Sequence, residues 1–299
     1  MNDSERLLID QVCNGDIKKA QEIARTILVG ITSEKDKKFK EYHLKKLDSK
    51  QAELVELPPN MRELLTAENS ALFPIDRFVL REGEERIAKS LLDAYEVSNE
   101  LADLGIRYVP SLLLYGESGT GKTALARYIA YKVNLPFVYV RFSTLVSSYL
   151  GSTQANVAKV FDYVKRTPCV LCFDEIDAIG AERGKGDLAE MNRVVIALMQ
   201  ELDSLQNGVM VIAATNRYDI LDKALVRRFQ LHHQVFPLEL SDVGDLVCKF
   251  FKAARVDYQS WLDGWFKSNF KGGESAATVI TKCTDRVVSI LIAEKNKNA

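Results

Sequence analysis

The sequence predicts an α/β protein whose parallel β-sheet is sandwiched by helices, with a small helical lid after it and a short helical region before it. Five short apolar runs lie between residues 111 and 236, and helical patterns fill most of the gaps between them. This alternation is typical of βαβ units. Beyond both ends of the α/β stretch the patterns are helical. We therefore expect a helical N-terminal region at 1–60, a large α/β domain at 61–236 and a helical lid at 237–299.

The composition fits a folded protein with a sizeable core. The chain has 299 residues, of which 47% are hydrophobic, and its net charge is −1. A disordered chain would have fewer apolar residues, and a protein that coats nucleic acid would have a basic excess. No run of 18 apolar residues occurs, and the N-terminus has early acidic residues unlike a secretory signal. We expect a cytoplasmic protein with neither membrane nor nucleic acid as its partner.

The five cysteines favour a reducing compartment over a disulfide framework, because their number is odd and they are scattered. Cys169 and Cys172 match a metal or redox half-motif by letters, but they lie within the apolar run CVLCF. Residues three apart on a strand point to opposite faces, so the two sulfur atoms would not meet. We expect both to be buried structural residues.

Residues 1–60 are predicted as helices followed by a linker. The first stretch has apolar residues at helical spacing with a break at Asn14–Gly15, and 33–54 has the pattern of a mixed-charge helix. Because lysines and acids are interleaved there, a solvated face is favoured over a nucleic-acid patch. The prolines of Leu57–Asn60 mark a linker or turn.

The apolar runs are the predicted strands. They are SLLLY at 111–115, PFVYV at 136–140, CVLCF at 169–173, VMVIAA at 209–214 and LHHQVF at 231–236. Two or three helices follow, with a break near Gly272–Gly273. Trp261 and Trp265 lie four residues apart on one of these helices and are expected in the core of the lid.

The first predicted strand runs directly into a glycine-rich loop that suits phosphate. Residues 116–123 read GESGTGKT, the pattern G-x-x-x-x-G-K-T, and a helical pattern follows. Glycines let backbone N–H groups point inward at phosphate oxygens, and the helix N-terminus adds a positive dipole. Lys122 would reach the β- and γ-phosphates, and the Thr123 hydroxyl would ligate Mg²⁺. The predicted nucleotide-binding residues are Gly116, Glu117, Ser118, Gly119, Thr120, Gly121, Lys122, Thr123 and Ala124.

A pair of acidic residues follows the third predicted strand. In CVLCFDEID the apolar run ends in Asp174 and Glu175. Ligands of open α/β sheets bind at the carboxyl ends of the parallel strands. Asp174 is therefore predicted to hold Mg²⁺, and Glu175 to polarise the attacking water as a general base. Together with the loop, this pair predicts an enzyme that hydrolyses ATP with Mg²⁺.

With these motifs the sequence resembles the P-loop AAA+ ATPases, and within them the classical AAA clade that includes katanin and spastin. The stretch GVMVIAATNRYDILDKALVRRF resembles the second region of homology of that clade. The resemblance implies that Asn216 is the sensor of the γ-phosphate and that Arg227 or Arg228 reaches the nucleotide of a neighbouring subunit. It therefore implies a homo-oligomer, hexameric in this family, whose active sites lie between subunits.

The resemblance also implies residues that contact the substrate and the adenine. Tyr149, Leu150 and Gly151 fill the places of the central-pore loop, where six copies of Tyr149 would grip an extended polypeptide. The stretch 181–190 fits a second pore loop. Asp76 lies in the segment that corresponds to the adenine contact of the family.

The sequence departs from the family pattern in places. Glu117–Ser118 replaces two prolines of the phosphate loop, which leaves the phosphate chemistry unchanged. In the lid, 272–275 stands where the family has S-G-A-D. Arg286 lies too far along the last helix to match a second sensor.

Three functions are compatible with these motifs. The first is a ring motor that remodels, unfolds or disassembles a protein substrate, with residues 1–60 recruiting an adaptor or partner enzyme. The second is a DNA-linked ATPase of the initiator or transposition-helper type, which would need a basic face that the charge balance argues against. The third is a nucleotide-dependent scaffold, which would not need Glu175 as a base. We favour the first.

Overall fold

The computed structural model describes residues 6, 7, 9, 10, 17–30, 40, 57–142, 145, 153–179, 187–205 and 208–297. The chain divides into two compact units, Met1–Leu54 and Val55–Ala299. In the first unit, α2 spans Ile17–Gly30 and buries Ala20 and Leu28. Apart from Lys40, the predicted mixed-charge helix at 33–54 lies outside the described residues.

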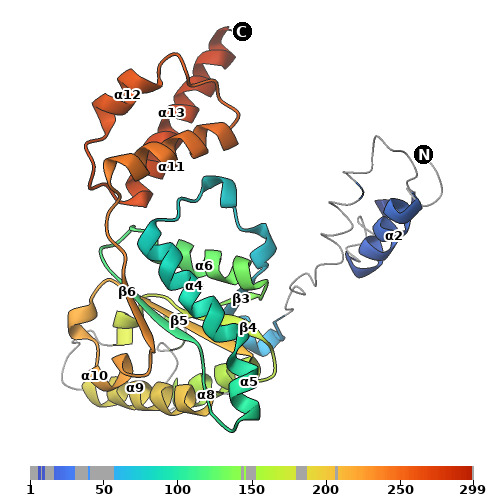
Figure 1. Cartoon of the computed structure of the whole chain (residues 1–299), viewed down its shortest axis with the longest axis vertical. Coiled ribbons are helices and arrows are strands. Elements are labelled where there is room, and N and C mark those ends of the chain that lie inside the picture. The colour runs from blue at the N-terminus through green and yellow to red at the C-terminus, as the bar shows by residue number, and fades with distance from the viewer. Residues whose placement is uncertain are drawn as a thin grey trace. The chain divides into compact units, whose positions relative to one another are not determined.

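Six strands of the described chain form one sheet in the order β1-β3-β4-β5-β2-β6 (Figure 1). Their bounds are Leu65–Glu68 for β1, Ser111–Tyr115 for β2, Phe137–Val140 for β3, Cys169–Phe173 for β4, Val209–Thr215 for β5 and Leu231–Gln234 for β6. Every residue of β4 and β5 is buried. Because both faces of the sheet are covered, these strands are continuous apolar runs. β2 to β6 pair in parallel and confirm the five predicted strands.

β1 adds one antiparallel strand to the predicted parallel sheet, because it pairs with β3 at one edge. Its sequence, LTAE, is too short and too mixed to predict a strand. Glu68 at its end accepts hydrogen bonds from Nε and Nη2 of Arg127, at 2.7 and 2.9 Å. Both side chains are more than a third exposed, so this ion pair contributes at most about 1 kcal/mol and the backbone pairing with β3 does most to hold the strand.

Helices cover both faces of the sheet (Figure 1). Those of one face are α4 (Glu82–Glu96) and α6 (Lys122–Val133), and those of the other are α8 (Thr153–Val164), α9 (Asp187–Ser204) and the short α10 (Lys223–Val226). Another short helix, α5 (Ser98–Asp103), follows α4. Each face of the sheet has its own hydrophobic cluster. Leu114 belongs to the cluster with α6, and Leu113 to the cluster with α8 and α9.

The two cysteines of β4 divide between these clusters, Cys169 on the α8 side and Cys172 on the α6 side. This confirms that their sulfur atoms point to opposite faces. Burial raises the pKa of the Cys169 thiol to about 12, and the pKa of Cys172 rises for the same reason. Both thiols are therefore protonated at neutral pH and serve the core.

The lid consists of α11 (Leu240–Ala253), α12 (Leu262–Asn269) and α13 (Ala276–Lys297), which share a third hydrophobic cluster. Trp261 and Trp265 lie in it with their ring centroids 6.0 Å apart, which confirms their predicted place in the lid core. The Arg286 guanidinium lies 4.3 Å from the centroid of the Trp261 ring. None of the described helices is long and apolar enough to cross a bilayer.

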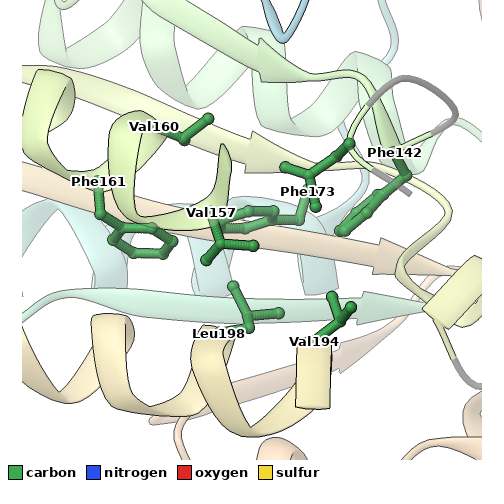
Figure 2. A pocket seen from close by; sticks show the side chains of 8 residues that line it. Phe142, Val157, Val160, Phe161, Phe173, Val194 and Leu198 are labelled. Carbon is green, nitrogen blue, oxygen red and sulfur yellow. The ribbon is translucent and has the colours of Figure 1, made fainter. Parts of the chain in front are cut away.

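Between the sheet and α8–α9 lies a small apolar cavity, lined by Phe142, Leu145, Val157, Val160, Phe161, Phe173, Val194 and Leu198 (Figure 2). The Phe161 ring of α8 stacks on Phe173 of β4 with centroids 6.0 Å apart. Phe173 precedes Asp174 directly, so this packing fixes the end of the strand that carries the acidic pair.

Phe161→Ala is expected to lower the free energy of unfolding by about 3–5 kcal/mol, because it enlarges a cavity whose walls are already packed. The matched control is Leu72→Ala, since Leu72 is 80% exposed and its truncation removes little buried area. Urea denaturation of both variants measures the difference. A loss below about 1 kcal/mol for Phe161→Ala would show that the site collapses on truncation.

Candidate active site

The glycine-rich loop joins β2 to α6 through three residues with positive φ. Gly116, Gly119 and Gly121 have φ of +146°, +77° and +107°. A Cβ on Gly116 would lie 2.2 Å from the carbonyl oxygen of Val235, which follows β6. Glycine is therefore required at 116 both for the backbone angle and for the close approach of the neighbouring chain. The loop also bonds within itself, because the Thr120 hydroxyl donates to the Glu117 carbonyl at 2.9 Å.

Lys122 is the first residue of α6, and it is only 6% exposed. Its Nζ donates to the carbonyl oxygens of Gly116 and Glu117 at 2.9 and 2.7 Å. Burial lowers the pKa of Lys122, and the charges of Asp174 and Asp177 oppose this effect by raising it. The ammonium is thus held inside the curl of the loop, facing the two acids.

The next residue, Thr123, connects the loop to the acidic pair. Its hydroxyl donates to Oδ2 of Asp174 at 2.5 Å. A hydroxyl and a carboxylate that converge in this way are the hard oxygen ligands that Mg²⁺ takes together with phosphate oxygens. The predicted metal residues therefore lie together and fit the ion.

Glu175 is exposed and has a φ of +52°, unusual for a residue other than glycine. Its N–H donates to Oδ1 of Asp174 at 3.0 Å. The chain turns sharply here, between β4 and the 3₁₀ helix η5 (Ile176–Ile179). Backbone strain of this kind is common at active sites, and here it brings the Glu175 side chain to the surface next to Asp174.

Asp177 also belongs to this site, although it is not among the residues predicted from the sequence. Its Oδ1 accepts from the Thr215 hydroxyl at 2.8 Å and from the Asn216 N–H at 3.4 Å. It therefore fixes the end of β5 beside the acidic pair, where Asn216 is exposed. The sequence signal was the third acid in FDEID, but its partner depends on strands that are distant in the chain.

The predicted residues thus gather where adjacent parallel strands end. Lys122 and Thr123 follow β2, Asp174 and Glu175 follow β4, and Asn216 follows β5, which lies between them. This edge is where ligands bind in open α/β sheets. Of the other loop residues, Glu117 and Ser118 are exposed, whereas Ala124 is half-buried in the first turn of α6.

The two arginines lie at the opposite end of the sheet. The Ser111 hydroxyl, at the start of β2, donates to the Arg228 carbonyl at 3.2 Å, whereas the phosphate loop follows the other end of that strand. The Arg228 guanidinium donates to the Ala224 carbonyl at 2.8 Å and to Asp203 at 3.1 Å. Arg227 is exposed and lines a hollow of about 550 Å³ with Arg107 and Arg228.

The predicted adenine and substrate contacts are not among the described residues that gather at the carboxyl ends of the strands. Asp76 is exposed on the 3₁₀ helix η4 (Ile75–Arg77), whose Arg77 lies over the Phe250 ring of α11, 5.6 Å from its centroid. Its adenine contact remains a prediction. Tyr149, Leu150 and the centre of the second predicted pore loop lie outside the described residues.

The lid reaches the phosphate loop through the start of α13. The Ala277 N–H donates to the Gly119 carbonyl at 3.1 Å. A Cβ on Gly119 would lie 3.0 Å from both Ser275 Oγ and Ala277 Cβ. The segment that departs from S-G-A-D in sequence therefore still leads into a direct contact with the loop.

Comparisons with known proteins give one family. A family model described as "ATPase family associated with various cellular activities (AAA)" matches residues 112–237. The uncharacterized AAA family ATPase y4kL of Sinorhizobium fredii is 31% identical over 220 residues, 73% of this chain and 66% of the relative. Peroxisomal ATPase PEX6 is 39% identical over 196 residues in Yarrowia lipolytica, 60% of this chain and 19% of the relative. PEX6 of Candida glabrata is 33% identical over 201 residues, which are 64% of this chain and 20% of the relative.

The chain therefore spans less than two thirds of the length of each of these relatives, 66% of the bacterial protein and about a fifth of PEX6. The residues matched by the family model, 112–237, include the phosphate loop, the acidic pair and the arginines.

Gly116→Ala is expected to lower the free energy of unfolding by more than Gly121→Ala, although both residues have a positive φ. A Cβ on Gly121 meets nothing within 4 Å, so that variant costs the backbone strain alone, about 1–2 kcal/mol. At 116 the clash with the Val235 carbonyl adds about 1–3 kcal/mol. Urea denaturation without nucleotide measures both variants, and equal losses would contradict the close approach.

Proposed function

Because the chain belongs to the AAA family of ATPases, we propose that it is a ring-forming motor. It hydrolyses Mg-ATP at the interfaces between its copies and uses the energy to remodel, unfold or disassemble a protein substrate. Hydrolysis of ATP is the activity of the family. The observation that carries the proposal is the convergence of Lys122, Thr123 and Asp174 at one sheet edge.

The residues of the site divide the reaction between them. The Lys122 ammonium binds the β- and γ-phosphates, whose oxygens replace the loop carbonyls as its partners. Thr123 and Asp174 hold Mg²⁺, which when bound neutralises charge on the phosphates. Glu175 accepts the proton of the attacking water, and Asn216 orients that water. Asp177 keeps Asn216 in place through the end of β5.

Arg227 is the better candidate for the cation supplied to a neighbouring subunit. Arg228 is held within its own chain by Ala224 and Asp203, whereas Arg227 is exposed. The full length of β2 separates the arginine pair from the phosphate loop of the same chain, about 13 Å of extended strand. A cation placed there serves a nucleotide bound by another copy and stabilises charge that develops during phosphoryl transfer.

A protein substrate fits the rest of the chain best. Tyr149 and Leu150 match a pore loop, and this loop leads into α8, whose Phe161 packs on Phe173 beside Asp174. Movement at the nucleotide site thus has a packed route to α8, which begins three residues after Leu150 in the sequence. The separate unit Met1–Leu54 is suited to recruit an adaptor or partner enzyme. The described cysteines are free thiols, which supports a reducing compartment such as the cytoplasm.

Glu175→Gln is expected to bind ATP but to hydrolyse it slowly, because the base is lost while the phosphate ligands remain. An assembled ring should therefore persist in ATP-Mg²⁺, and light scattering should show an ATP-dependent shift to about six subunits, the number implied by the family resemblance. The same variant in ADP is the control. A particle that stays monomeric at all ATP and protein concentrations would contradict the ring.

Tyr149→Ala is expected to retain ATPase activity and to lose substrate processing, because it removes the grip on the polypeptide and leaves the nucleotide site intact. The paired measurements are phosphate release and unfolding of a tagged model substrate. Ser148→Ala, next to it in the same loop, is the matched control and should process normally. Normal processing by Tyr149→Ala would exclude threading by this residue.

A further inference from the structure

Three aromatic rings form a series on one face of the sheet. The centroid of Tyr218 lies 4.5 Å from that of Tyr115 and 6.4 Å from that of His232. Leu113 of β2 is in register with His232 of β6, and Tyr115 lies two residues further along β2. Residues in register or two apart on paired strands share a face, so Tyr218 lies over both rings.

His232, at one end of this series, contacts the residues that flank the arginine pair. The Nε2 atom of His232 lies 3.2 Å from the carbonyl oxygen of Val226 and 3.0 Å from that of Phe229. A carbonyl oxygen only accepts hydrogen bonds, so Nε2 carries a proton and donates to both. Val226 and Phe229 are the residues directly before and after Arg227–Arg228. The imidazole therefore stabilises the turn that contains both arginines.

The other end reaches the nucleotide site of the same chain. Tyr115 is the last residue of β2, directly before Gly116 of the phosphate loop. Tyr218 begins the 3₁₀ helix η6 (Tyr218–Ile220), two residues after Asn216. The N–H of the intervening Arg217 donates to the Thr215 hydroxyl at 2.9 Å, and that hydroxyl donates to Asp177. The position of Tyr218 is thus tied to the acidic motif and to the loop.

We propose that His232 is a positioning residue for the arginine pair that serves the neighbouring subunit, and that Tyr218 and Tyr115 link its ring to the phosphate loop of its own subunit. This inference rests on the proposed function, because the arginines must act between subunits. The inference predicts an effect on one of two neighbouring subunits and not on the other. A change at His232 alters hydrolysis in the adjacent subunit and leaves the phosphate ligands of its own subunit in place.

Both rings are suited to substitution. His232 is exposed on the edge strand β6 and Tyr218 is exposed on η6, so changing them does not open the core. His232→Phe keeps an aromatic ring under Tyr218 and removes the donor. His232→Gln keeps an amide donor near the position of Nε2 and is the conservative variant.

The test mixes two subunits that are each inactive for a different reason. Arg227→Ala keeps an intact nucleotide site, and Glu175→Gln keeps intact arginines, so hydrolysis arises where a Glu175→Gln subunit supplies its arginine to an Arg227→Ala subunit. His232→Phe is then placed in one or the other partner. We expect at least a tenfold loss of ATPase activity when it accompanies Glu175→Gln, since small displacements of a catalytic group cost up to about a hundredfold. The same change in the Arg227→Ala partner should leave the rate near the parent mixture, and His232→Gln should restore most of the loss.

The outcomes distinguish failure of the proposed function from failure of the role proposed for His232. A parent mixture without activity overturns the shared active site of the proposed function, and the role of His232 with it. Activity in the parent mixture, with loss in only the Glu175→Gln placement, supports the inference. Equal loss in both placements indicates a structural role and overturns it, as does an unchanged rate in both.

Discussion

The buried charge of Lys122 is the constraint on which the nucleotide site depends. An ammonium that is 6% exposed must find carbonyl or carboxylate partners, because an unpaired buried charge costs several kcal/mol. The loop supplies two carbonyls, and the negative charges of Asp174, directly after β4, and Asp177, on η5, favour the ammonium. Parallel pairing of β4, β5 and β2 brings the carboxyl ends of these strands to one edge. The strand order, the positive φ angles of the glycines and the strained backbone at Glu175 all belong to the structure that surrounds the Lys122 ammonium.

Much of this was predictable because its signals are local. The loop residues are contiguous, and strands that are buried on both faces appear in sequence as continuous apolar runs. The opposite directions of Cys169 and Cys172 follow from strand periodicity alone. β1 had no such signal, since its four residues owe their conformation to β3 and to Arg127 of α6. Asp177 and the restraint on Arg228 depend on which distant elements are paired, which a single sequence does not encode locally.

The two ends of the sheet have different tasks. The predicted nucleotide ligands gather at the carboxyl ends of the strands, and the turn that contains Arg227 and Arg228 is attached to the amino end of β2 through Ser111. The length of β2 lies between them, so in the proposed ring the arginines of one chain would serve the site of its neighbour. The family relationship and this geometry lead independently to the same expectation of assembly.

The buried cysteines have a practical consequence. Cys169 and Cys172 are fully covered in the central strand β4, while Cys283 is covered in the core of the lid, where burial raises its pKa to about 12. An alkylating reagent reaches such thiols only when the surrounding segment opens. The rate at which each of these thiols is alkylated therefore reports how often its own core, that of the sheet or that of the lid, opens. Mass spectrometry of the labelled peptides would time the opening of the lid separately from that of the sheet, with no probe added to either.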